Sequence, residues 1–414
     1  MKTPAPFPFL PVQFLAAMSC VCLAAITLGA APRLPDIAYR LHLLDPGANE
    51  TAAIADLNRD GKPDIISGER WYEAPTWQPH PLREINSTRN YIDNFSDLPV
   101  DVDGDGNVDI VQVSYFAHNM VWLKNPGPGN YDRPWAVTEI DATSLSEFAF
   151  LVDLNNDGKA LEILPQFGAK VPAVWFELQQ GKWVKHVVST RSYGHGIGAG
   201  DVNGDGRNDI ITPEGWLEAP ADVHADTLWV FHPTDWNLHP IAPSAPASSA
   251  APPPSGKIQF GFMHVIDLNG DGRNDILTTS AHAYGLCWFE QLADGTWKQH
   301  VIDNSWSQAH ASLLVDINGD GRLDFVTGKR YMAHNGADVG EREPIGLYWY
   351  DYHRDETGAL EWTRHLIDYG GRMGGGMQIC VQDLDGDGDL DVVTGGKAGL
   401  TLAENLTVSS VRKK

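Results

Sequence analysis

Cysteine is scarce in this chain: four occur among 414 residues, and two of them, Cys20 and Cys22, lie in the N-terminal segment. The other two, Cys287 and Cys380, fall in different repeats, so we expect buried free thiols rather than a disulfide. A small scaffold stapled by disulfides is therefore excluded. A secreted chain without disulfides needs another means of bracing its fold.

Positive charge and helical patterning are also lacking. The 30 Lys and Arg residues are outnumbered by 54 Asp and Glu, which gives a net charge of −24. They form no basic stripe, so we expect no nucleic-acid partner. No part of the repeats sustains the 3.6-residue periodicity of an amphipathic helix, which favours an all-β fold.

Long apolar runs are absent except near the N-terminus. Residues 1–31 combine a lysine, an apolar stretch near residues 14–30 and small residues at the end. This pattern is typical of a secretory signal peptide removed around Ala30 or Ala31, and a retained membrane anchor is the alternative. We expect a secreted or periplasmic protein with no retained membrane span.

An aspartate-rich loop occurs seven times. In "DVNGDGRND" (201–209), side-chain oxygens stand at positions 1, 3, 5 and 9, and Gly206 at position 6 allows a sharp turn. Alternating hard oxygen ligands on a tight loop suit Ca²⁺. Position 12 is Thr212 rather than glutamate, and a β-branched run follows, which excludes an EF-hand. We therefore predict about seven structural Ca²⁺ ions.

The predicted calcium ligands occupy the same four positions in each loop. They are Asp56, Asn58, Asp60, Asp64, Asp101, Asp103, Asp105, Asp109, Asp153, Asn155, Asp157, Glu162, Asp201, Asn203, Asp205, Asp209, Asp267, Asn269, Asp271, Asp275, Asp316, Asn318, Asp320, Asp324, Asp383, Asp385, Asp387 and Asp391.

The third loop departs from the pattern, because position 9 is Leu161 and Glu162 follows one residue later. Either the longer glutamate side chain reaches the ion, or this site is lost and six ions remain. The seven loops hold 24 carboxylates and six Lys or Arg, so the net charge indicates calcium more than a cationic partner.

Each loop belongs to a repeat of 45–67 residues, with one strand-like run before it and three after it. Aromatic third runs include "AVWFELQ" (173–179), and "WVKHVVS" (183–189) is a typical fourth run. In the fourth repeat we assign "TLWVFHP" (227–233) to the third run and "WNLHPIA" (236–242) to the fourth. Seven units of four short antiparallel strands predict a seven-bladed β-propeller.

The two ends of the repeat region complement each other. The last repeat ends at "GLTLAEN" (399–405) without a fourth strand, whereas "YRLHLLD" (39–45) has no repeat of its own. We infer that the N-terminal strand completes the seventh blade and closes the ring, which hides the sheet edges. One propeller domain then spans residues 32–408.

Two segments fall outside the predicted blades. "APSAPASSAAPPPSG" (242–256) cannot form a core, so we expect a mobile loop between blades four and five. Residues 409–414 form a C-terminal tail.

The order strand, "D-x-[DN]-x-D-G-x-x-D", strand resembles the FG-GAP/VCBS repeats of integrin-α-type seven-bladed propellers. This resemblance covers nearly the whole mature chain and implies calcium loops on one face of the ring. More weakly, the histidine-bearing strands resemble the propeller domain of aldos-2-ulose dehydratases, which are sugar dehydratases with a metal in the propeller. The cupin domains of those enzymes are absent here.

A second set of residues lies six positions before the first Asp of each loop, where the innermost strands begin. The set comprises Glu50, Phe95, Glu147, His195, Gly261, His310 and Met377. Because propeller connections alternate between two faces, these strand starts gather around a central funnel opposite the calcium loops. Two histidines and two glutamates at such a place indicate a ligand or a metal.

The connections between second and third strands reach the same face. They add Arg70, Trp71, His118, Trp216, His282, Lys329, Arg330, Tyr331 and His334. For each of these residues a structural role is the open alternative: core packing for the tryptophans and the histidines, and rim charge for the cations. Histidines on the outermost strands, such as His186 and His300, are expected to be structural.

Two chemistries suit this funnel. Convergent histidines and carboxylates suit Zn²⁺ or another divalent transition metal. Alternatively, a general base beside cationic groups can abstract a proton next to a carbonyl and stabilise the enolate. The predicted catalytic set is His195, His310, Tyr331, Lys329 and Arg70. The predicted substrate-binding set is Glu50, Glu147, His118, His282, His334, Trp71 and Trp216.

We therefore predict a monomeric carbohydrate lyase or dehydratase that acts by β-elimination on an oxidised or acidic sugar. A non-catalytic propeller that binds carbohydrate or protein is the main alternative. A structural part of a larger surface assembly is a third.

Overall fold

The structure is a computed structural model that describes residues 36–142, 146–166, 168, 171–234, 236, 241, 243–244 and 259–408. The predicted signal peptide, the C-terminal tail and all but two residues of the predicted mobile loop lie outside these ranges.

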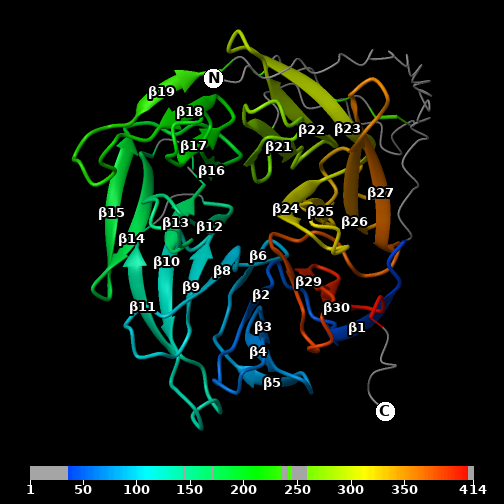
Figure 1. Ribbon diagram of the computed structural model, residues 1–414. Helices are drawn as coiled ribbons and strands as arrows, with labels where there is room; N and C mark the ends of the chain where they lie inside the picture. Colours follow the sequence, from blue (N-terminus) through cyan, green and yellow to red (C-terminus); the bar gives the residue numbers. More distant parts are fainter. Residues whose placement is uncertain are drawn as a thin grey trace, which may run out of the picture.

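Seven antiparallel sheets of four strands are arranged around a central axis, and Figure 1 shows the ring along this axis. The predicted all-β, seven-bladed propeller is confirmed. No helix in the described part of the chain is long and apolar enough to cross a membrane.

The strands follow one another from the axis outwards in each of the first six blades. Blade one contains β2 (Ala53–Ala55), β3 (Asp64–Ser67), β4 (Arg70–Glu73) and β5 (Gln78–Pro81). Blade two contains β8 (Ser96–Val100), β9 (Asp109–Ser114), β10 (Asn119–Lys124) and β11 (Ala136–Asp141). Blade three contains β12 (Ala149–Val152), β13 (Glu162–Pro165), β14 (Ala173–Gln179) and β15 (Lys182–Ser189).

The second half of the ring has the same order. Blade four contains β16 (Gly198–Gly200), β17 (Asp209–Thr212), β18 (Gly215–Glu218) and β19 (Val230–Pro233). Blade five contains β20 (His264–Ile266), β21 (Asp275–Thr279), β22 (Tyr284–Gln291) and β23 (Trp297–Ser307). Blade six contains β24 (Ala309–Val315), β25 (Asp324–Lys329), β26 (Gly346–Arg354) and β27 (Leu360–Tyr369).

Blade seven joins the two ends of the repeat region. It contains β28 (Ile379–Gln382), β29 (Asp391–Gly396), β30 (Gly399–Asn405) and, as its outermost strand, β1 (Tyr39–Asp45). β1 pairs antiparallel with β30 in a register that begins at Tyr39 and Asn405. The N-terminal strand thus lies where the sequence places it.

Blade four corrects one strand assignment. Its third strand is β18, in "GWLE", and "VFHP" of the predicted third run forms the fourth strand β19. The error arose because Trp229 and His232 lie on the same run, whereas other blades place the tryptophan on the third strand and the histidine on the fourth. Most of the predicted fourth run, including His239, lies outside the described residues.

Neighbouring blades are held together by apolar side chains. The second strands are buried on both faces, as in β17 with its "DIIT" sequence. Between blades six and seven, Val326 and Trp349 pack in one cluster with Val392 and Ala403. Cys287 is buried and Cys380 is half-buried, and both are free thiols as predicted.

The first strands of neighbouring blades contact one another around the axis, as for β2 with β8, β12 with β8, and β24 with β28. They are therefore the innermost strands. Each aspartate-rich loop joins a first strand to a second strand, so all seven loops lie on one face of the ring. The starts of the first strands and the connections between second and third strands lie on the other face, which we call the funnel face.

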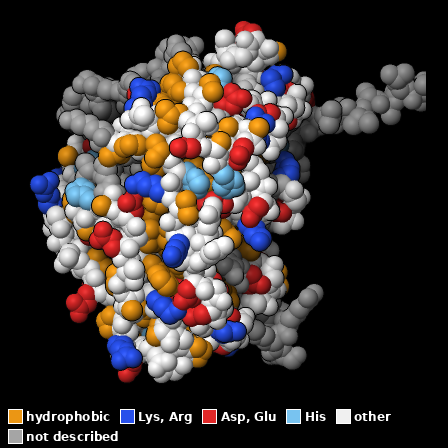
Figure 2. All heavy atoms as spheres, turned by 90° about the vertical axis from the view of Figure 1, so that its left-hand side faces the viewer, with side chains coloured by type: hydrophobic (Ala, Val, Ile, Leu, Met, Phe, Trp, Pro, Cys, Tyr) orange, Lys and Arg blue, Asp and Glu red, His pale blue; other side chains and the backbone are white. Residues whose placement is uncertain are grey.

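The outer side of blades two to four is shown in Figure 2. On that side Lys and Arg side chains are scattered among Asp and Glu and form no continuous basic patch.

Candidate metal centre

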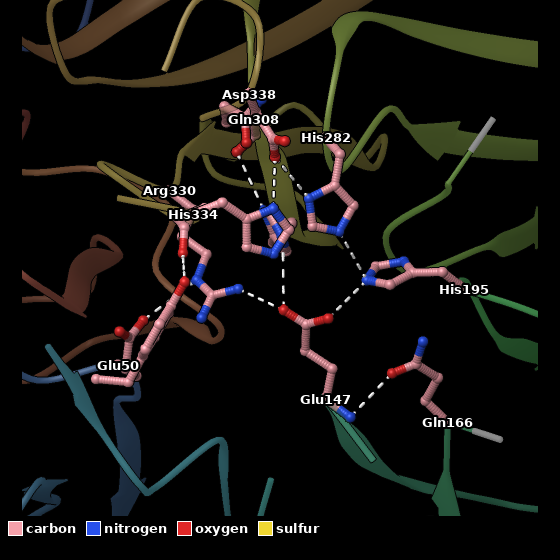
Figure 3. Close-up of polar contacts among 12 residues, drawn as sticks. Glu50, Glu147, Gln166, His195, His282, Gln308, Arg330, His334 and Asp338 are labelled. Carbon is pink, nitrogen blue, oxygen red and sulfur yellow. Dashed lines mark hydrogen bonds and ion pairs between the residues drawn. The ribbon is translucent and has the colours of Figure 1, made fainter. Parts of the chain in front are cut away.

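Four side chains from four consecutive blades meet on the funnel face near the axis (Figure 3). Glu147 and His195 precede the innermost strands of blades three and four, and His310 lies at the start of β24 in blade six. His282 follows β21 in blade five. One ligand atom from each of the four lies within 4.8 Å of the others. We call this group the axial centre.

The three histidines of the axial centre are oriented in the same way. Each uses Nδ1 as the donor of a hydrogen bond, because its partner is an acceptor, and therefore turns Nε2 towards the centre. The acceptors are the Phe260 carbonyl for His195 at 2.7 Å, the Asp338 carboxylate for His282 at 3.0 Å and the Gln308 carbonyl for His310 at 3.4 Å.

The distances between the converging atoms match a metal site. His195 Nε2 lies 2.8 Å from Glu147 Oε2 and 3.1 Å from His282 Nε2. His310 Nε2 lies 3.8 Å from Glu147 Oε1, too far for a hydrogen bond, and is a buried atom without a hydrogen-bond partner among the described residues. Zinc–nitrogen distances of about 2.0–2.1 Å imply ligand atoms about 3.3 Å apart in a tetrahedron.

Two neutral imidazoles that face each other through Nε2 lone pairs repel each other unless a proton or a cation lies between them. Burial lowers the pKa of His282, and burial together with the charge of Arg330 holds the pKa of His310 well below its usual value. Although burial opposes it, the contact with His195 and the charge of Arg330 keep the pKa of Glu147 well below its usual range. Neutral imidazoles and an ionised carboxylate are the forms that bind a metal. The donor set therefore fits a divalent transition metal.

Arg330 fixes the carboxylate from behind. Its Nη1 donates to Glu147 Oε1 at 2.5 Å, and its Nε donates to Glu50 Oε2 at 3.2 Å. Its guanidinium carbon lies 5.3 Å from the ring centre of Phe95 and 5.9 Å from that of Tyr91. Tyr91 belongs to β7 (Tyr91–Ile92), which pairs with β6 (Ser87–Thr88) in a hairpin between blades one and two that the sequence did not predict.

A fourth histidine lies beside the axial centre without belonging to it. The ring of His334 stacks on that of His282 with 4.5 Å between the centroids and 6° between the planes. Its Nδ1 bonds the same Asp338 oxygen, at 2.8 Å, that holds His282. The His334 side chain is 42% exposed, whereas that of His310 is fully buried. His334 is therefore the imidazole of this group that solvent and solutes reach.

The buried carboxylate of Glu341 shapes the loop that carries these residues. It accepts the backbone N–H of Asp338 at 3.1 Å and that of His334. The loop thus presents Asp338 and His334 in a fixed relation to His282.

Comparison with protein families matches a model for the FG-GAP-like repeat at residues 101–164 and 267–327. The chain is therefore a seven-bladed propeller that contains FG-GAP-like repeats. The resemblance drawn from the aspartate-rich loops is confirmed in this respect.

Several solved structures resemble this FG-GAP propeller, although all share little sequence with it. BBS1N in complex with ARL6DN is 8% identical, covers 90% of this chain and 97% of its own, and has a TM-score of 0.51. An Agrocybe aegerita lectin that recognises non-reducing terminal N-acetylglucosamine is 18% identical, with 91% and 94% covered and a TM-score of 0.45. The V. cholerae biofilm matrix protein Bap1 is 12% identical, with 87% and 81% covered and a TM-score of 0.34. No curated protein matches the sequence.

In this FG-GAP propeller, six of the twelve predicted funnel residues come together. Glu147, His195, His282 and His310 form the axial centre, Glu50 joins it through Arg330, and His334 joins it through Asp338. Two signals found them: the shared position six residues before each loop, and the connection between second and third strands.

The other six predicted funnel residues lie elsewhere. Lys329 is buried, where its ammonium donates to Ser307 Oγ at 3.1 Å and to the Gly340 carbonyl at 2.5 Å. Tyr331 is 38% exposed beside Arg330. Arg70 and His118 are exposed on blades one and two, and within the described residues no hydrogen bond or ion pair joins either to the axial centre.

The two predicted tryptophans belong to a structural series instead of a sugar platform. Trp71 is fully buried and stacks on His80 at 4.3 Å, and Trp216 stacks on His232 at 4.2 Å. Blades three, five and six repeat this pair of a third-strand tryptophan and a fourth-strand histidine. The outer-strand histidines are thus structural, as predicted.

Sequence reasoning missed Asp338 and Gln308, and it placed Arg330 on the funnel face without giving it a role in the site. Arg330 and Asp338 lie in the segment "GKRYMAHNGADVGEREP" (328–344) that supplied Lys329, Tyr331 and His334. The spacing of His334 and Asp338 was an available signal. Gln308 acts through its backbone carbonyl, which no residue type reveals.

The aspartate-rich loops are folded as cation-binding loops require. In the fourth loop, Asp201 accepts the backbone N–H of Gly206 at 2.9 Å, and Asn203 accepts that of Asp205 at 3.0 Å. Asp209 accepts the N–H of Val202 at 3.0 Å. These bonds turn the carboxylate and amide oxygens towards the inside of the loop, and such a donor set fits Ca²⁺.

The third loop keeps this arrangement despite its changed spacing. Glu162 Oε2 accepts the backbone N–H of Leu154 at 2.9 Å, the bond that the ninth-position aspartate makes in the other loops. The longer glutamate side chain thus compensates for the extra residue, Leu161.

Proposed function

We propose that this FG-GAP propeller is an extracytoplasmic, calcium-braced protein whose axial centre binds a divalent transition metal and catalyses β-elimination from an oxidised or acidic sugar. The observation that carries the proposal is the convergence of three Nε2 atoms and one carboxylate, with each Nδ1 already committed to an acceptor. Protein metal sites orient their histidines in this manner.

His195, His282, His310 and Glu147 would hold the metal, which would supply Lewis-acid polarisation of a carbonyl or carboxylate oxygen. Arg330 keeps Glu147 in place and offsets the negative charge of the two buried glutamates. A core made only of apolar side chains would need no such buried arginine to offset negative charge.

His334 is the candidate proton acceptor. Asp338 binds its Nδ1, which leaves Nε2 as the free acceptor, and the side chain is exposed beside the axial centre. In the elimination, the C–H bond next to the carbonyl breaks and its proton passes to His334. The electron pair forms the C=C bond, and the C–O bond at the neighbouring carbon breaks with protonation of the leaving oxygen.

Calcium in the seven loops is the second part of the proposal. The inward-facing oxygens described above support it, as does the absence of a disulfide among the described residues. The N-terminal pattern of residues 1–31 supports export to a compartment in which calcium is available.

The test combines metal analysis with a substrate screen. Mass spectrometry of the purified mature protein should find one transition metal per chain beside calcium, and none in Glu147→Gln or His310→Ala. Oxidised and uronic sugars should yield unsaturated products with the wild type, while His334→Asn keeps the metal and loses turnover. A wild-type protein without transition metal after incubation with Zn²⁺ would overturn the metal proposal.

One observation favours a second candidate, a non-catalytic carbohydrate- or protein-binding propeller. Four protein ligands fill a tetrahedral coordination shell, as in structural zinc sites, whereas catalytic zinc sites keep one position open. A metal-loaded protein that binds sugars in the screen without product formation, and whose His334→Asn variant binds them equally well, would support this candidate.

A further inference from the structure

A cavity of about 620 Å³ opens on the funnel face between blades five and six. Its lining includes Tyr284, Trp306, Glu343, Tyr348, Arg364 and Tyr369. A volume of this size falls within the range of ligand cavities. We call it the interblade pocket.

The interblade pocket and the axial centre lie on opposite sides of one loop. In the connection from β25 to β26, Asp338 bonds His282 on the axial side, and Glu343 accepts the Tyr284 hydroxyl at 2.5 Å on the pocket side. His282 and Tyr284 are two residues apart. The two sites therefore lie next to each other, on either side of the same connections.

The polar groups of the interblade pocket are held in place before any ligand binds. Arg364 donates to Asp303 Oδ2 at 3.0 Å and to Ser305 Oγ at 2.6 Å, and its guanidinium carbon lies 5.1 Å from the ring centre of Tyr348. Tyr369 at the rim is 58% exposed. The Asp36 and Glu343 carboxylates also line the pocket, so Arg364, through the guanidinium nitrogens that Asp303 and Ser305 do not occupy, is the group that would bind the carboxylate of a sugar ring stacked on Tyr369.

We propose that the interblade pocket is a subsite for a second acidic sugar unit, so that the ligand of this protein is an acidic oligosaccharide or polysaccharide. This inference rests on the proposed function for the identity of the first unit. It adds the length of the ligand and the residues that recognise its extension.

The grooves between other blades can be compared with the interblade pocket to show which of its features are specific. A groove of about 390 Å³ lies between blades one and two, and one of about 270 Å³ lies between blades two and three. Such grooves follow from the spacing of the blades. The interblade pocket is larger, and among these three it alone combines several tyrosines with an arginine held by its neighbours. The groove between blades one and two therefore provides a matched control.

The experiment measures binding as a function of ligand length. Oligogalacturonates and oligomannuronates of one to four units are titrated calorimetrically into the metal-loaded His334→Asn variant, which should keep the metal and lack turnover. In at least one series, the Kd should fall about tenfold or more between one and three units. Tyr369→Ala and Arg364→Gln should each remove this gain and leave the Kd for one unit unchanged. Asn86→Ala, in the groove between blades one and two, should have no effect.

Each result decides the proposal. Equal affinity for one and four units in both series, or an undiminished gain in Tyr369→Ala and Arg364→Gln, would overturn it. Because Tyr369 is exposed, its substitution should leave the melting temperature and the calcium content unchanged, and both are measured. If the wild type forms elimination products but affinity does not depend on ligand length, the subsite proposal is wrong and the proposed function stands. If affinity depends on ligand length but no elimination occurs, the subsite stands and the proposed catalytic function is wrong.

Discussion

The two faces of this propeller are built by opposite rules. On the face of the aspartate-rich loops, one nine-residue pattern recurs in every blade, with one extra residue in the third copy, and each copy uses its own side chains to fold its own backbone. On the funnel face, the blades contribute unequally: blades three to six each supply one residue of the axial centre, three of them from the same strand-start position, and blades one and six add insertions. Repetition here indicates a frame, because identical local structures need no partner. Irregularity indicates function, because side chains from different blades must meet.

Removal of calcium should have the largest effect on this comparison. The seven emptied loops would leave clustered carboxylates unpaired, and each site loses about 2.7 kcal/mol if it was saturated at a hundredfold excess over its Kd. Excess EGTA should therefore lower the melting temperature strongly in differential scanning calorimetry, and added Ca²⁺ should restore it.

The control for this prediction is His310→Ala, which lacks the axial centre. A drop of the same size in this variant assigns the effect to the loops. Melting curves that do not respond to the chelator would refute the calcium assignment.

Deletion of residues 36–45 should have the next largest effect. The deletion removes β1 and exposes the edge of β30, together with the unpaired backbone groups that β1 covered, so the protein should aggregate. Size-exclusion chromatography with light scattering measures this. Leu41→Ser, at an exposed position of β1, is the matched control and should remain monomeric. A deletion variant that stays monomeric and equally stable would show that β1 does not close the ring.

The buried histidine at the start of β20, His264, should make the stability of the protein depend on pH. Burial lowers the pKa of His264 from 6.5 to about 3, and its Nε2 contacts Ser312 Oγ at 3.0 Å. Above pH 6.5, His264 is neutral in both the folded and the unfolded state. Between pH 6.5 and about pH 3, it is protonated in the unfolded state but stays neutral in the folded state. Stability is thus fully present above pH 6.5 and is lost towards pH 3, by about 3 kcal/mol between pH 7 and pH 4.

His264→Gln should remove this part of the pH dependence. Urea unfolding in calcium at several pH values measures the free energy of unfolding of both proteins, and the other titrating groups cancel in the difference. Parallel curves for wild type and variant would contradict the assignment.

A matched pair of histidines makes the finest distinction between frame and function. His195→Ala should empty the axial centre and lower turnover at least about 100-fold, with the calcium content unchanged. His300→Ala breaks a stack on Trp288 at 4.3 Å and a bond to Glu290 at 2.8 Å, so it should cost about 1 kcal/mol of stability and leave the metal in place. Metal analysis and chemical denaturation measure the two effects. Similar losses in both variants would mean that the axial histidines are also structural.

The sequence carries most of the frame and about half of the site. The loops and the innermost strand starts are set by local pattern, which is why counting back from each loop found Glu147, His195 and His310. The bond of Asp338 to His282 joins residues 56 positions apart, and no local pattern encodes it. Trp71 was predicted to bind substrate because the sequence shows only that it lies near the connection between the second and third strands of its blade. The sequence does not show that its side chain packs on His80.

The pairing of β1 with β30 also determines how the ring bears a mechanical load. Tyr39 pairs with Asn405 at the first rung, and the Leu406 N–H donates to the Ala38 carbonyl at 2.9 Å, so both chain ends leave the sheet at the same end of this strand pair. That end is the side of the aspartate-rich loops, because the Asn405 N–H donates to Asp391. A force applied to the two ends would therefore break the hydrogen bonds one after another, as in unzipping, and not all at once, as in shear. A tether at either end would leave the funnel face turned away from the anchor.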